Sequence, residues 1–116
     1  MKQPLPKSGW RELLAWRFGR RHAFRMADEA MIPTLPPDAV IFFDPAAYDK
    51  QSPQVGDLVL TRHPFQAEVQ MIRRVGEIRA DGRYILHSDN PLWNDNRGFG
   101  NMPHGHILAK VTSRLK

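Results

Sequence analysis

Side chains of the kinds used in acid–base, nucleophilic or metal chemistry gather in a few short stretches of this chain. One stretch reads DEAMIPTL, residues 28–35, and another holds the arginine pair at 73 and 74. Polar side chains follow at Asp89, Asn90, Asp95 and Arg97. The chain has no cysteine, which excludes thiolate nucleophiles, thiolate metal sites and disulfides. Any catalysis would therefore depend on hydroxyl, carboxylate, imidazole or amine groups.

Three histidines raise the question of a metal site. His104 and His106 are two residues apart on a predicted strand, so their side chains would share one face, and His87 lies earlier in the chain. Two imidazoles without a third nearby ligand are weak evidence for a metal ion. We therefore expect no metal and no cofactor, with the histidines on the surface or hydrogen-bonded.

The elements that must position these residues are mostly strands. Short apolar or alternating runs at 39–45, 55–64, 68–78, 83–89 and 104–115 are separated by turn signals, and Ala-Asp-Gly at 80–82 predicts a hairpin. A chain of 116 residues has room for one core. The sequence predicts a mainly β, antiparallel domain over residues 23–116.

Residues 1–22 form a separate arm. The first seven are polar with two prolines and are expected to be loose, whereas the following residues predict a short amphipathic helix with Ser8 as N-cap, ending at Gly19. Trp16 lies off the main apolar stripe of this helix. The stripe recurs at i, i+3, i+4 and i+8 and consists of Trp10, Leu13, Leu14 and Phe18.

Positive charge is concentrated in the arm. Residues 1–26 hold seven Lys/Arg, including Arg17, Arg20 and Arg21, and one Glu, for a net charge of +6, and the remainder carries −1. This imbalance predicts an acidic partner for the arm, such as a membrane surface, nucleic acid or an acidic protein. No apolar run approaches the roughly 20 residues that cross a bilayer. We expect a cytoplasmic protein, with peripheral membrane contact through the arm left open.

The apolar stripe of the predicted helix has three destinations. It could pack on the β domain, enter a lipid interface, or anchor a partner protein through Trp10, Trp16 and Phe18. The sequence does not choose among these. A sequence-specific nucleic-acid regulator is disfavoured, because one short helix cannot both read a groove and cross the backbone.

Four separated stretches resemble the boxes of the S24/S26 peptidase superfamily. The chain has D-E-A-M-I-P-T-L and P-P-D-A-V-I-F-F-D-P at 28–45, V-G-D-L-V at 55–59, I-R-R-V at 72–75, and S-D-N then D-N-R-G-F-G at 88–100. The family patterns are G-x-S-M-x-P-T-L with P-G-D, V-G-D-V-V, I-K-R-V, and G-D-N with D-S-R-x-F-G. The chain is most similar to signal peptidase-like proteases that mature nickel-containing superoxide dismutase. The resemblance implies a partly open antiparallel β-barrel of the LexA and signal peptidase type.

The resemblance also implies two catalytic positions, and this chain departs from the family at both. Family members use a serine nucleophile and a neutral lysine base. Ala30 occupies the serine position and has no attacking oxygen. Arg73 occupies the lysine position and stays protonated. The resemblance therefore predicts an inactive member. Of two consecutive arginines on a strand we expect one solvated and one paired, with Arg73 pointing into the former active site and meeting a carboxylate such as Asp28 or Glu29.

Further family positions differ together with the dyad. Asp28, Pro37 and Ser88 replace glycines, and Asn96 replaces a serine. Ser88 has no base beside it, so we do not expect it to be a substitute nucleophile. Several simultaneous changes favour a natural pseudoenzyme over a protease silenced by design, although the sequence leaves both open.

The resemblance implies a groove in which an extended peptide adds as a strand. Its expected lining is Ala30, Met31, Ile32, Pro33, Thr34, Val69, Met71 and Arg73. Asp89, Asn90, Asp95 and Arg97 are expected to hold the neighbouring loop. The predicted function is a peptide-binding or regulatory pseudoprotease. The alternatives are an endopeptidase of the superoxide dismutase maturation or signal peptidase type inactivated by engineered substitutions, and a structural subunit of a larger assembly.

Overall fold

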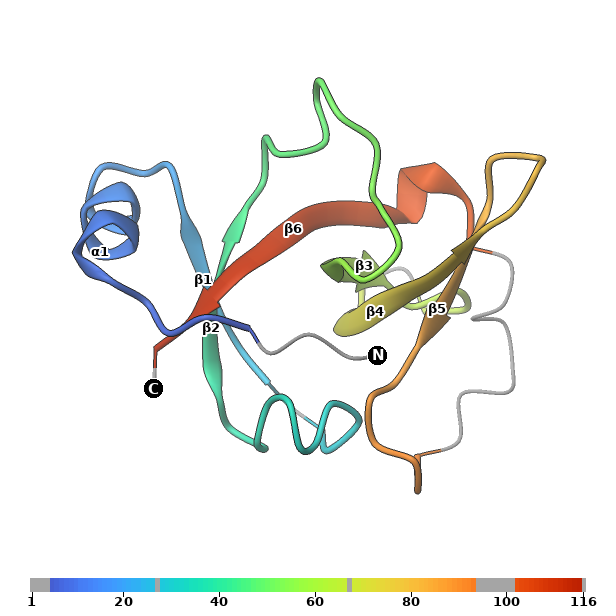
Figure 1. Cartoon of the computed structure of the whole chain (residues 1–116), viewed down its shortest axis with the longest axis horizontal. Coiled ribbons are helices and arrows are strands. Elements are labelled where there is room, and N and C mark those ends of the chain that lie inside the picture. The colour runs from blue at the N-terminus through green and yellow to red at the C-terminus, as the bar shows by residue number, and fades with distance from the viewer. Residues whose placement is uncertain (1–4, 27, 67, 94–101, 116) are drawn as a thin grey trace.

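The computed structural model describes residues 5–26, 28–66, 68–93 and 102–115 and shows a mainly β fold with one short helix (Figure 1). The helix α1 spans Trp10–Arg17. The strands are β1 His22–Arg25, β2 Val40–Asp44, β3 Leu58–Arg62, β4 Gln70–Ile78, β5 Tyr84–His87 and β6 Ile107–Arg114. The predicted strands are confirmed apart from their ends, and β1 is one that the sequence did not reveal.

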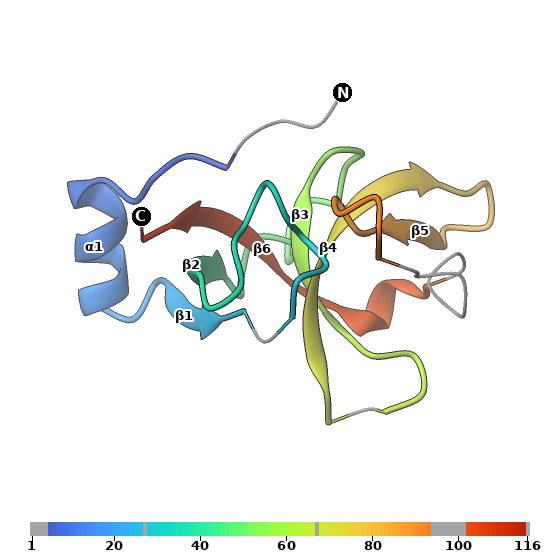
Figure 2. The same cartoon turned by 90° about the horizontal axis from the view of Figure 1, so that it is seen from below.

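The strands form a single open sheet in the order β1-β2-β6-β3-β4-β5, and all five pairs are antiparallel. Register shifts interrupt the β2–β6, β3–β6 and β4–β5 pairs. Such bulges bend and twist strands, so the sheet curls instead of lying flat (Figures 1 and 2). The expected antiparallel, partly open barrel-like sheet is therefore confirmed.

Side-chain alternation gives the sheet two buried faces. On β3, Leu58 and Leu60 belong to one apolar cluster and Val59 belongs to the other, because neighbouring residues of a strand point to opposite faces. On β4, Ile72 and Met71 are divided in the same way. β3 and the middle of β4 are thus buried on both sides of the sheet, so neighbouring residues there face different apolar clusters.

The hairpin between β4 and β5 matches its sequence signal. Gly82 adopts a positive φ of 86°, and the Gly82 amide donates to the Arg79 carbonyl at 2.9 Å. At the β4–β5 bulge, a Cβ on Gly76 would lie 1.9 Å from the exposed imidazole of His87. Only glycine allows this close approach without displacing the ring.

Three local expectations were wrong. Residues His104–His106 form a 3₁₀ helix before β6, so the two imidazoles do not share a strand face. Ser8 does not cap α1, because its hydroxyl pairs with Ser113 at 2.7 Å and Gly9 is the N-cap. The arm is not loose from residue 5 onward, since Leu5 is buried and the Arg114 amide donates to the Pro6 carbonyl at 3.0 Å.

Candidate functional site

The turn segment between β1 and β2 places residue 30 against β4. The Asp28 carboxylate accepts a hydrogen bond from the Ala30 amide at 3.0 Å, and its other oxygen lies 3.7 Å from the Arg73 guanidinium. Ala30 is fully buried, and Arg73 is only 2% exposed. The expected contact between Arg73 and Asp28 is therefore present, and residues 30 and 73 are neighbours of the same carboxylate.

The adjacent arginine is buried on the opposite side of β4. Arg74 donates from Nε at 2.9 Å and from Nη2 at 2.8 Å to the carboxylate of Asp89, and from Nη1 at 2.8 Å to the Gly56 carbonyl. The expectation that one arginine of this pair would be solvated was wrong. Each one faces a different carboxylate, because consecutive residues on a strand point to opposite faces.

The loop after β5 is tied to the turn segment. The Thr34 hydroxyl donates to Asp89 at 2.5 Å, the Asn90 side-chain amide donates to the Glu29 carbonyl at 2.9 Å, and the Asn90 backbone amide donates to the Ala30 carbonyl at 2.8 Å. The two segments accordingly lie side by side in Figure 1. Asp89 and Asn90 thus fix the backbone on both sides of residue 30. Asp95 and Arg97 lie outside the described residues.

The chemistry available at this site is limited. Residue 30 offers a methyl group, and residue 73 offers a cation that does not accept a proton at physiological pH. The Thr34 hydroxyl belongs to the same turn segment and donates to Asp89, whose carboxylate also accepts two donors of Arg74.

The predicted peptide groove is lined unevenly. Ala30, Met31, Met71 and Arg73 are buried, so their side chains present little surface. Pro33 is exposed, and the remaining three predicted residues, Ile32, Thr34 and Val69, are half-buried. An incoming chain would therefore meet a few side chains and a stretch of backbone. That these residues bind a peptide stays a prediction.

The backbone at this site includes an open strand edge. Residues Gln70 to Arg74 pair with β3, whereas β5 pairs only with the half of β4 from Arg74 to Ile78. Within the described part of the chain, no strand pairs with residues 70–72 on the side that β5 occupies further along, although the Arg73 guanidinium donates to the Ile72 carbonyl at 2.7 Å. Backbone groups on such an edge are available to an added strand.

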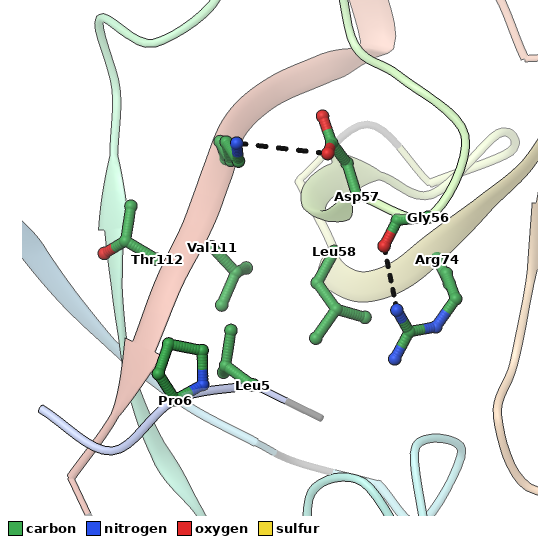
Figure 3. Close-up of a pocket in the computed structure, with 9 residues that line it drawn as sticks. Leu5, Pro6, Gly56, Asp57, Leu58, Arg74, Val111 and Thr112 are labelled. Atoms are coloured by element: carbon green, nitrogen blue, oxygen red, sulfur yellow. Dashed lines mark hydrogen bonds and ion pairs between the residues drawn. The ribbon is translucent and has the colours of Figure 1, made fainter. Parts of the chain in front are cut away.

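A cavity that the sequence did not reveal lies on the other side of Arg74. It has a volume of about 320 Å³ and is shown in Figure 3. Lys110 lies 3.9 Å from Asp57 at its rim, and the Tyr48 hydroxyl donates to Asp57 at 2.7 Å. Burial and the adjacent Asp57 carboxylate raise the pKa of Tyr48 above its ordinary value. The Gly-Asp turn at 56–57 was the only sequence signal for this cavity.

The histidines do not gather into a metal site. In the described residues, no group of three or more histidine and carboxylate side chains could hold a metal ion. His106 contacts the Met102 sulfur at 3.2 Å through Nδ1, and the His104 ring lies 6.0 Å from that of Tyr84.

The apolar stripe of α1 does not pack on the sheet. Trp10, Leu13, Leu14 and Phe18 are all exposed, and no residue of the helix is fully buried. Instead Trp16, the residue off the stripe, stacks on Phe42 with ring centroids 6.0 Å apart. Of the three destinations left open by the sequence, packing of the stripe on the β domain is therefore not the one that the structure shows.

Comparison of the chain with protein-family models, curated proteins and solved structures gives no match. The S24/S26 resemblance therefore depends on the four sequence boxes and stays a prediction. Among the helices of the described residues, none has the length and apolar character required to span a membrane.

Proposed function

We propose that this protein is a pseudoprotease with an S24/S26 peptidase-like fold, which binds an extended peptide segment of another protein without cleaving it. The observation that carries the proposal is the carboxylate of Asp28, which contacts both Ala30 and Arg73. All three residues depart from the family pattern, and they meet at one point. An ion pair and a methyl group thus occupy the region where the resemblance would place a nucleophile and its base.

Asp28, Ala30 and Arg73 all differ from the family pattern and lie together. Their proximity supports natural replacement of the catalytic residues over a deliberate knock-out. Burial of a guanidinium is costly without a nearby carboxylate, and the Asp28 carboxylate, 3.7 Å away, helps to offset that cost for Arg73. Changing the nucleophile alone would silence an enzyme without requiring this pair. The substitutions are therefore physically coupled.

The open edge of β4 supports peptide binding. Strand addition needs unpaired backbone donors and acceptors beside side-chain pockets. Residues 70–72 supply the edge, where the Ile72 carbonyl is already bonded to the Arg73 side chain at 2.7 Å. Val69 precedes this edge in the chain and Ile32 lies two residues after Ala30, and both are half-buried apolar residues. The bonds of Asn90 to the Glu29 and Ala30 carbonyls hold the turn segment rigid, which lowers the entropic cost of binding.

Selection of binders from a random displayed-peptide library tests this proposal. We expect selected peptides to bind in an extended form and to remain intact during long incubation, as checked by mass spectrometry. Methylation of alternate backbone amides in a selected peptide should abolish binding, because it removes the main-chain donors. Substitution Ile32→Lys should weaken binding, whereas the matched control Ile85→Lys, at a half-buried position on β5, should not.

Three outcomes would contradict the proposal in different ways. Cleavage of a peptide by the unmodified protein would remove the claim of inactivity. If methylated and unmethylated peptides bound equally well, binding by strand addition would be contradicted. If the folded protein selected no peptide from the library, the claim that it binds peptides would be contradicted.

A further inference from the structure

The helix α1 is held against the sheet by its polar side. Glu12 accepts hydrogen bonds from Thr112, from Ser113 at 3.0 Å and from Arg21 at 3.0 Å. The stacking of Trp16 on Phe42 adds an apolar contact on the same side. Three polar partners and one ring contact fix the rotation of the helix about its axis, so the opposite face must point away from the protein.

That outward face is the most apolar part of the helix. Trp10 is 67% exposed and Phe18 is 74% exposed, with Leu13 and Leu14 exposed between them. An open cavity of about 470 Å³ lies on this face, lined by Trp10, Arg11, Leu14, Ala15, Phe18 and Arg20. Both views place α1 at one end of the molecule, beyond β1 and β2 (Figures 1 and 2). The face is therefore a projecting surface and not a gap in the core.

Arginines border this apolar face. The Arg11 guanidinium lies 5.4 Å from the centre of the Trp10 ring, Arg17 is in the last turn, and Arg20 lines the cavity. All three side chains are exposed. Arg21 is different, because Glu12 and Asp44 both pair with it. The net charge of +6 in residues 1–26 thus coincides with the exposed apolar side chains.

We infer that the outward face of α1 docks on an anionic lipid surface. Exposed tryptophan, phenylalanine and leucine side chains can enter the boundary between headgroups and acyl chains while arginines contact anionic headgroups. A second copy of the chain fits less well, since it would bring two arginine-bordered faces together. Nucleic acid fits less well too, because Leu13 and Leu14 offer nothing to phosphates and poor stacking to bases.

This inference does not depend on the proposed peptide binding. In Figure 1, α1 lies at the opposite end of the molecule from β4 and β5. Docking through α1 would therefore leave the open edge of β4 accessible. The two activities can be tested separately with variants on different elements.

Vesicle binding of the full chain provides the test. Vesicles of phosphatidylcholine alone are compared with vesicles that contain phosphatidylglycerol, and binding is followed by co-sedimentation and by the shift of tryptophan emission. We expect binding to the anionic vesicles only, weakened by added salt. Phe18→Ser should lower the partition constant roughly tenfold or more, since it removes a large apolar side chain that docking would bury in the lipid. Phe65→Ser is the matched control, because Phe65 is 73% exposed in the loop that follows β3.

A second pair of variants tests the charge. Arg17→Gln with Arg20→Gln should lower binding about tenfold to thirtyfold, at roughly 1 kcal/mol for each arginine near an anionic surface. The control is Arg62→Gln with Arg79→Gln, which removes two exposed arginines elsewhere. Circular dichroism and thermal unfolding must show that all variants fold.

Several results would overturn the inference. One is the absence of binding to anionic vesicles. Another is binding to neutral vesicles as strong as to anionic ones. A third is a loss of binding in the control variants as large as in the α1 variants. A concentration-dependent dimer that Phe18→Ser abolishes, with no vesicle binding by the monomer, would assign the face to a second copy instead. Vesicle binding that fails while peptide selection succeeds would leave the proposed function intact.

Discussion

Arg74 and Asp89 form a buried, two-pronged ion pair that joins β4 to the loop after β5. Nε and Nη2 of the arginine lie 2.9 Å and 2.8 Å from the carboxylate oxygens, and Asp89 is 1% exposed. The same carboxylate accepts the Thr34 hydroxyl. One side chain therefore connects the turn segment, β4 and the loop that flank residue 30.

Removal of one partner of this pair should be strongly destabilising. We expect Asp89→Asn to lower the free energy of unfolding by about 3–5 kcal/mol, because it removes the carboxylate charge from a buried ion pair. The double variant Arg74→Met with Asp89→Leu should cost less than the sum of the two single variants. Urea unfolding followed by tryptophan fluorescence measures both. Asp49→Asn, an exposed control, should change stability by less than about 0.5 kcal/mol, and a similar loss there would contradict the assignment.

The Asp28–Arg73 pair should respond asymmetrically to substitution. Asp28→Asn keeps an acceptor for the Ala30 amide but removes the carboxylate charge beside the buried Arg73, so we expect a loss of about 1–3 kcal/mol. Arg73→Met removes the buried charge itself and should change stability by less than about 1 kcal/mol in either direction. Glu77→Gln, exposed on the same strand, serves as the control. A larger loss for Arg73→Met than for Asp28→Asn would refute this account.

Restoring the family residues tests whether the site keeps a catalytic geometry. We expect Ala30→Ser with Arg73→Lys to remain nearly inactive, because the neighbouring Asp28 carboxylate would keep a lysine at 73 charged. Adding Asp28→Gly removes that carboxylate and should give measurable cleavage of a peptide pool, detected by mass spectrometry. The single variant Ala30→Ser is the matched control and should be inactive. Equal activity of the double and triple variants would show that Asp28 does not control the base.

Tyr48 should make stability fall at high pH. Burial, together with the hydrogen bond to Asp57, raises the pKa of Tyr48 in the folded chain, whereas the unfolded chain ionises near pH 10. Above that pH the unfolded state holds fewer protons at this group, so its contribution to stability is full below about pH 10 and is lost as the pH rises. The difference in unfolding free energy between wild type and Tyr48→Phe should therefore shrink at high pH. A constant difference from neutral to alkaline pH would contradict this prediction.

The sequence determined the strand content, the hairpin at 80–82 and the absence of a nucleophile at residue 30. These follow from local alternation, turn residues and side-chain chemistry, which neighbours along the chain largely decide. The sequence also identified Arg73 as a residue that needs a carboxylate, because a buried guanidinium requires a counter-charge. The S24/S26 resemblance pointed to residues 30 and 73 as the positions of the family nucleophile and base, but it did not show which residues surround them.

Only the tertiary structure decided which carboxylate each arginine meets and which face of α1 is covered. Asp28 and Asp89 are distant from β4 in the chain, so their pairing depends on how the turn segment and the loop cross the sheet. The periodicity of α1 reveals an apolar stripe but not the direction in which it points. Glu12 decides that direction, because its bonds to Thr112 and Ser113 join segments about a hundred residues apart, and such pairing leaves no local signal in the sequence.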